Sequence, residues 1–139
     1  MPVITNIVTA IVQHLKSAEF TPPFREVALS PALPAAGYPS ASVVVEDELF
    51  GEQPADAAAI VTVTLGVAKG REYDSRDAAR DLAHQLRRSL FRTDGVQGLV
   101  KSLSVRRISY SAGGETQPGL PVVARAELEL EIKYCEPEA

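Results

Sequence analysis

The chain has one cysteine, no tryptophan and few aromatic residues. Its single thiol, Cys135, excludes an internal disulfide, and such cysteine usage is typical of assembly in a reducing cytoplasm. No apolar run approaches the roughly 18 residues that a membrane span needs. The N-terminal segment also lacks the basic leader of a secretory signal, so we expect it to remain on the protein as a helix.

Clusters of basic residues with interleaved aromatic residues are also missing. The net charge is −4, with 14 Lys and Arg residues against 18 Asp and Glu residues. Binding to phosphates depends on clustered Lys and Arg, so the composition disfavours direct readout of nucleic acid.

Hydrophobic residues are sufficient for one ordinary domain. The 139 residues are 45% hydrophobic and 23% charged, a composition typical of a soluble globular protein. A chain of this size buries roughly 68–70% of its unfolded surface. We therefore predict a single domain over residues 1–139 that needs no metal or disulfide for its core.

Helical periodicity occurs in two segments. Apolar residues recur at helical spacing over residues 5–17, with Thr5 as the expected N-cap. A second amphipathic helix is predicted over residues 74–90, with Asp74 as the N-cap and with basic residues in its last turn.

Runs typical of β-strands cover residues 25–30, 42–50, 59–69, 99–111 and 122–135. The run at 59–69 is apolar on both sides, which predicts a central strand. The segments 51–58 and 112–121 read as hairpin connections, and the proline-rich segment 30–41 as an extended surface connection.

This order of elements predicts an α+β fold. We expect a mostly antiparallel sheet of four or five strands with the two main helices packed on one face. The other face must then carry polar residues or be covered by another subunit.

Carboxylates gather on the last strand, where Glu127, Glu129 and Glu131 alternate with apolar residues. They lie about 6.6 Å apart along a strand, which falls in the range of an inverting carboxylate pair. Such a pair also needs a cleft and one raised pKa, and the sequence offers neither an aromatic sugar platform nor a histidine partner. Because Arg125 and Lys133 share this face, ion pairs across strands, for example with Lys101 or Arg107, are the simpler interpretation.

Other reactive side chains give no stronger signal. His14 and His84 lie on the two predicted helices without a metal ligand four residues away, so solvated or capping roles are expected. Cys135 has no histidine in its local sequence and is interpreted as a structural thiol. We therefore expect neither enzymatic activity nor a cofactor or metal.

The layout as a whole resembles the tail terminator proteins of tailed bacteriophages. The features that carry the resemblance are the helix "ITNIVTAIVQHLKS", the approach "YPSASVVVEDELF", the strand "AIVTVTLGVAK", the helix "DSRDAARDLAHQLRRSL" and the strand "ARAELELEIKY". The resemblance implies a virion protein, assembled in the host cytoplasm, that closes as a hexameric ring on the tail tube. It also implies that this ring ends tube growth, offers a surface to the head connector or neck protein, and lets genomic DNA pass through its lumen.

Such a ring requires contacts between subunits, and two predicted surfaces are suitable for them. One is the face with Glu127, Glu129 and Glu131 flanked by Arg125 and Lys133, which is expected to meet a neighbour or line the lumen. The other consists of the two connecting loops, represented by Phe50, Glu52, Gln53, Asp56, Glu115, Thr116 and Gln117.

Two other functions remain open. A neck or head-completion protein of the head–tail junction would also be small, acidic and ring-forming. A small α+β enzyme or ligand-binding domain would instead need a concave site with a perturbed acid or base between its helices and its sheet.

Overall fold

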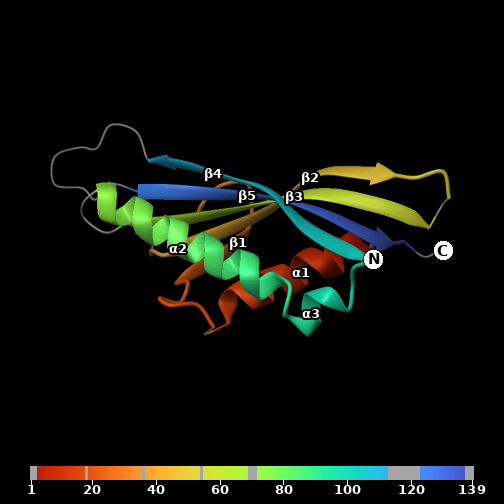
Figure 1. Cartoon of the computed structure of the whole chain (residues 1–139), viewed down its shortest axis with the longest axis horizontal. Helices are drawn as coiled ribbons and strands as arrows, with labels where there is room; N and C mark the ends of the chain where they lie inside the picture. The colour runs from red at the N-terminus through yellow and green to blue at the C-terminus, as the bar shows by residue number, and fades with distance from the viewer. Residues whose placement is uncertain are drawn as a thin grey trace.

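The computed structural model describes residues 3–17, 19–35, 37–53, 55–68, 72–112 and 123–136. Helices and strands follow one another as α1 (Val3–Lys16), β1 (Glu26–Leu29), β2 (Ser40–Phe50), β3 (Asp56–Ala68), α2 (Glu72–Leu90), α3 (Asp94–Gln97), β4 (Ser102–Ala112) and β5 (Val123–Cys135). Figure 1 shows an elongated molecule in which the strands run along its length. None of the helices in these ranges is long and apolar enough to cross a membrane.

The strands form one five-stranded sheet in the order β1-β2-β3-β5-β4. β1 pairs with β2 in parallel, whereas the other neighbouring strands pair in antiparallel fashion. The predicted α+β class is confirmed, and so is the central position of β3. The sheet is mixed, because the segment between β1 and β2 returns to the start of β1 before β2 begins, so both strands run in the same direction.

Strand β5 shows why one side of the sheet is core. Its even-numbered residues from Ala124 to Tyr134 are buried, while its odd-numbered residues are exposed or half-buried. The register pairs Leu130 with Val61 of β3 and with Val105 of β4, so apolar side chains of adjacent strands share this face. We call this the inner face and the opposite one the outer face.

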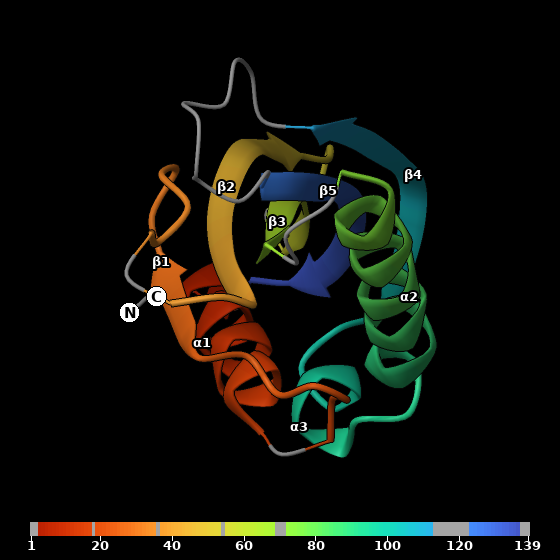
Figure 2. The same ribbon diagram turned by 90° about the vertical axis from the view of Figure 1, so that its left-hand side faces the viewer.

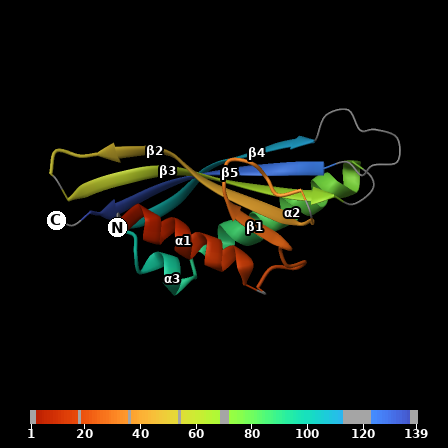
Figure 3. The ribbon, with the colours of Figure 1, turned by 180° about the vertical axis from the view of Figure 1, so that it is seen from behind.

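The helices supply the other half of the core. α1 contacts β1 and β2, and α2 contacts β3, β5 and β4. Figure 2, which looks along the sheet, shows α1 beside β1 and β2, and α2 beside β4 and β5. In Figures 1 and 3 the helices lie on the same side of the sheet, and the hairpin of β2 and β3 projects past the end of α1.

Helix boundaries differ from the prediction at both N-termini. α1 begins at Val3, so Thr5 lies inside the helix, where its backbone carbonyl accepts a hydrogen bond from Thr9 Oγ1 at 2.7 Å. α2 begins at Glu72, which puts Asp74 in the first turn and not at the N-cap. For α1, a distant carboxylate takes the capping role, since the Val3 amide donates to Glu136 Oε2 at 3.2 Å. The two residues are 133 positions apart in the chain, so the local sequence around the helix cannot reveal this cap.

The short helix α3 was not predicted, because its glycines were interpreted only as a stop after α2. It buries Val96 against the core. The Gln97 side chain donates to the Leu90 carbonyl at 2.7 Å, which satisfies an acceptor at the C-terminus of α2.

Candidate functional site

The outer face lies on the side of the sheet away from the helices. On β5 it consists of Arg125, Glu127, Glu129, Glu131 and Lys133, all of which are exposed or half-buried. The predicted grouping of these five residues on one face follows from the register with β3 and β4. They form an alternating row along β5, which has β3, β2 and β1 on one side and β4 on the other.

The three glutamates lie among neutral and basic neighbours. Glu127 pairs with Thr64 and Ser109, and Glu129 pairs with Thr62 and Arg107. Neither position lies opposite another carboxylate, so cross-strand pairing brings no second acid to these two glutamates. The hollows lined by Phe50, by Val44, by Phe91 and by Tyr38 do not include any of the three glutamates.

The ion pairs differ from the two predicted examples. Glu131 Oε2 lies 3.5 Å from Arg106 Nε, where the register of β4 shifts between Val105 and Arg107. Arg107 is instead the residue aligned with Glu129. Lys101 pairs with Asp56, Nζ to Oδ1 at 3.2 Å, because it precedes β4 at the end of the sheet where β3 begins. The general interpretation as a charged surface therefore fits, but with different partners.

The connection between β2 and β3 is shorter than predicted. Phe50 is the last residue of β2 and Asp56 the first of β3, so both belong to strands and not to a long loop. The Gly51 amide donates to the Asp56 carbonyl at 3.0 Å, and the Asp56 amide donates to Gln53 at 2.9 Å, which closes the turn. Glu52 and Gln53 are exposed at its tip. Glu115, Thr116 and Gln117 lie outside the described residues.

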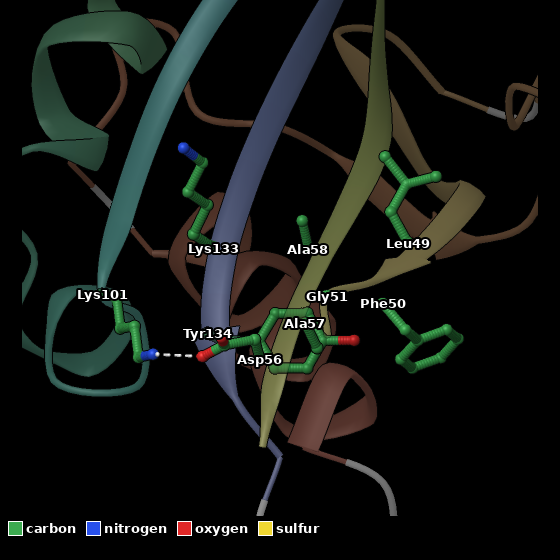
Figure 4. A pocket seen from close by; sticks show the side chains of 9 residues that line it. All are labelled: Leu49, Phe50, Gly51, Asp56, Ala57, Ala58, Lys101, Lys133 and Tyr134. Atoms are coloured by element: carbon green, nitrogen blue, oxygen red, sulfur yellow. Dashed lines mark hydrogen bonds and ion pairs between the residues drawn. The ribbon is translucent and has the colours of Figure 1, made fainter. Parts of the chain in front are cut away.

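A hollow of about 320 Å³ lies beside the turn of this hairpin. Figure 4 shows the Lys101–Asp56 ion pair on one side of it and Leu49 and Phe50 of β2 on the other. Phe50 is 70% exposed and Leu49 is 55% exposed. Exposed large apolar side chains at a projecting tip are typical of a contact with another molecule.

Tyr134 borders the same hollow from the end of β5. Burial, together with the nearby charges of Glu48 and Glu136, raises the pKa of its phenol above the usual value. The hydroxyl group therefore stays protonated at neutral pH and is no ready base.

His14 is buried, in contrast to the solvated or capping role predicted for it. Its Nε2 lies 2.7 Å from Ser89 Oγ on α2, and Ser89 Oγ donates to the Leu86 carbonyl at 3.1 Å. Because the serine proton is used by Leu86, Nε2 must carry a proton and donate it. The ring also stacks edge-on against Phe20, with centroids 5.3 Å apart. His14 thus joins α1 to α2, while His84 is half-buried elsewhere on α2.

This environment predicts a loss of stability in mild acid. Burial lowers the pKa of His14 below its usual value of 6.5, and the nearby Glu19 opposes this shift only in part. As the pH falls through 6.5, the unfolded chain takes up a proton that the folded chain still refuses, so the free energy of unfolding decreases. The slope cannot exceed about 1.4 kcal/mol per pH unit for one proton. Urea unfolding between pH 8 and pH 5 measures it.

The matched control for this prediction is His14→Gln, whose amide can still donate to Ser89 but does not titrate. We expect this variant to lose the part of the pH dependence that lies above pH 5, where carboxyl groups titrate little. Equal slopes in both proteins would show that His14 does not govern acid sensitivity.

Cys135 is a free thiol at the last position of β5, and it is exposed. This exposure follows from its position, since odd-numbered residues of β5 point away from the core. Its interpretation as a structural thiol, in place of a nucleophile, stays a prediction. Across the described ranges, no group of three or more His, Cys, Asp or Glu residues is arranged to hold a metal ion.

A basic surface at the end of α2 was missed by the sequence analysis. Arg87, Arg88 and Arg92 surround Phe91, which is 50% exposed, beside a hollow of about 430 Å³. The signal was present as the run "RRSLFR", in which an aromatic residue lies among three arginines. It is a local patch at the C-terminal end of a helix, where basic side chains also complement the helix dipole.

Comparison with known proteins gives no match, either to a family model or to a curated protein.

Proposed function

We propose that this chain is a structural protein of a phage tail that closes as a ring, most simply a hexamer, on the last ring of the tail tube. In this role it ends tube growth and provides a surface for the head connector or neck protein. The observation that carries the proposal is the outer face, a broad charged surface that the helices of the chain leave uncovered. A two-layer domain with an open sheet face has a surface available for neighbours or for a lumen.

The resemblance to tail terminators supplies the specific role, and two features of the structure support it. Both main helices lie on the same side of the sheet, so they leave the row of charged residues on the outer face of β5 uncovered. The projecting hairpin presents Phe50 and Leu49, which suit contact with an adjacent subunit or with the tube. Capping is achieved by binding, so the proposal requires no catalyst, cofactor or membrane.

In the proposed ring, the glutamates of β5 face the lumen through which genomic DNA passes. Like charge between Glu127, Glu129 and Glu131 and the DNA phosphates prevents the duplex from adhering to the wall. Reversing all three charges separates two roles. Slower DNA passage through an intact ring supports a lumen wall, whereas failed ring assembly with normal passage in the remaining particles identifies an interface.

Tube capping is the direct test. Tail tubes are purified without their terminator and mixed with this protein, and mass photometry and electron microscopy measure ring formation and tube length. We expect rings to form at one end of each tube and further tube growth to stop. A stable dimer that ignores tubes contradicts the proposal.

The neck or head-completion alternative would use the same surfaces, but it differs from the terminator in its binding partner. In a competition between tail tubes and portal-bearing heads, a terminator binds the tubes in the absence of heads. A neck protein binds the heads in the absence of tubes.

A further inference from the structure

The sheet has a long free edge on β2. β1 pairs only with Ser40–Val43 of β2, so in the described part of the chain the outer edge of residues 44–50 has no partner strand. This stretch contains Glu46, Asp47 and Glu48, followed by the apolar Leu49 and Phe50, and these five residues are all exposed. We call residues 46–50 the acidic edge.

The edge on the other side of the sheet, on β4, carries the opposite charge. β4 is the last strand in the sheet order, and among the described residues it pairs with β5 alone. It carries Arg106 and Arg107, both exposed, and no acidic residue between Ser102 and Ala112. We call residues 104–111 the basic edge. Unpaired backbone groups along such an edge are a template for another strand.

The strand directions suit a contact between these two edges. β2, β3, β5 and β4 alternate in direction, because each neighbouring pair is antiparallel. A second copy placed beside the first by rotation about an axis along the strands brings its β4 next to β2 in the antiparallel sense. The outer faces of the two sheets then become continuous.

Charged side chains meet on the same face in this arrangement. Asp47 is aligned with Ile60, which is aligned with Glu131, and Arg107 is aligned with Glu129. Asp47 and Arg107 therefore both lie on the outer face, each at its own edge. Pairing two acidic edges or two basic edges would bring like charges together, whereas pairing unlike edges brings opposite charges together.

Beside the acidic edge there is also a place for an apolar side chain. A hollow of about 250 Å³ opens where β1 ends, lined by Ile4 and Val8 of α1, by Leu29, and by residues 43–45 of β2. In the arrangement above, the C-terminal half of β4 from the second copy would lie beside this hollow. There Tyr110 is 39% exposed and, aligned with the buried Ala126, lies on the inner face.

We propose that the acidic edge of one copy of this chain pairs, strand to strand and antiparallel, with the basic edge of the next copy. The proposal rests on the ring function above and specifies its interface. Because two different surfaces meet, the contact is head-to-tail, and repeating it around an axis closes a ring or extends a filament. The occupant of each edge is thus a second copy of the same chain.

Charge reversal tests the pairing in the purified full chain. We expect Asp47→Arg or Arg107→Asp to weaken self-association at least about tenfold, measured by sedimentation velocity over a concentration series. The double variant D47R/R107D restores the attraction with exchanged signs. A mixture of the two single variants also associates, because each edge then meets an opposite charge.

Controls with the same change of charge are available away from both edges. Asp77→Arg matches D47R and Arg88→Asp matches R107D, both at exposed positions of α2. We expect both to associate like the unchanged chain, and circular dichroism verifies that all variants are folded. Equal weakening by edge and control variants would assign the effect to net charge and overturn the pairing.

Cross-linking tests the polarity. In a Cys135→Ser background, a short bismaleimide should convert the D47C/R107C chain into a ladder of oligomers, while either single-cysteine variant gives none. A cross-linked dimer of one single variant would reveal like-edge pairing and overturn the proposal. So would a chain that stays monomeric at every concentration and yields no cross-linked species.

The two proposals fail separately. If D47R caps tail tubes as well as the unchanged chain, the edges are not the ring interface, although the capping function stands. If the edges pair as described but tubes are never capped, the interface stands and the tail function does not.

Discussion

Leu130→Ala should destabilise the folded chain by about 3 kcal/mol, within the range of about 2–5 kcal/mol measured for such buried truncations. Leu130 is fully buried on the inner face of β5. It lies between Val61 of β3 and Val105 of β4. Removing its branched end leaves a cavity that neither flanking strand can fill, because both are held in register. Since domains are stable by only about 5–15 kcal/mol, this is a large fraction of the total.

Chemical denaturation at neutral pH measures this loss, with Glu129→Ala as the matched control. Glu129 is the preceding residue of the same strand, but it lies on the outer face and is half-buried. Its truncation should cost less than about 1 kcal/mol. Similar losses at both positions would mean that β5 does not separate a core face from a surface.

The contrast between these adjacent residues explains why much of the fold could be predicted. A strand with period-two alternation specifies its own buried side, so the faces of β5 are readable from residues 124–134 alone. The same holds for β3, whose apolar residues on both sides correctly indicated a central strand. These patterns are local, because each depends only on the spacing of apolar residues within one segment.

Features that depend on distant segments were not predictable in this way. His14 is polar and lies on a helix, but its burial depends on Ser89, which is 75 residues away in the chain. The parallel pairing of β1 depends on the path of the connection between β1 and β2, which the proline-rich composition did not reveal. The identity of the two sheet edges depends on strand order, since β5 inserts between β3 and β4.

The candidate site was predictable to a similar degree. The five charged residues of β5 share one face, as their spacing indicated. Their ion-pair partner was missed by one position, because the register shift next to Arg106 moves the arginine toward Glu131. The acidic edge was visible as "EDELF". Because β1 is short, no other strand in the described ranges pairs with the outer edge of that segment. Sequence thus indicates which residues lie on a face, while topology determines which surfaces are free.

Gly66→Val should destabilise the chain by about 2 kcal/mol, as expected for overpacking at a well-filled site. Gly66 lies on the outer face of β3, opposite Ser40 of β2 and Arg125 of β5. A Cβ atom there would overlap the side chain of Leu33 and lie 3.4 Å from Ser40 Oγ. The segment before β2 thus lies over this part of the sheet, and the glycine is needed for the close approach. A β-branched side chain cannot be accommodated unless Leu33 is displaced.

A double-mutant cycle separates this overlap from an effect on the strand itself. Leu33→Ala removes the colliding group, so the G66V/L33A variant should lose less stability than the sum of the two single losses, by at least about 0.5 kcal/mol. Thr62→Val, on the same face of the same strand, replaces one β-branched residue with another and should change stability little. If G66V costs the same with and without the Leu33 side chain, the contact between Leu33 and the sheet does not govern this position.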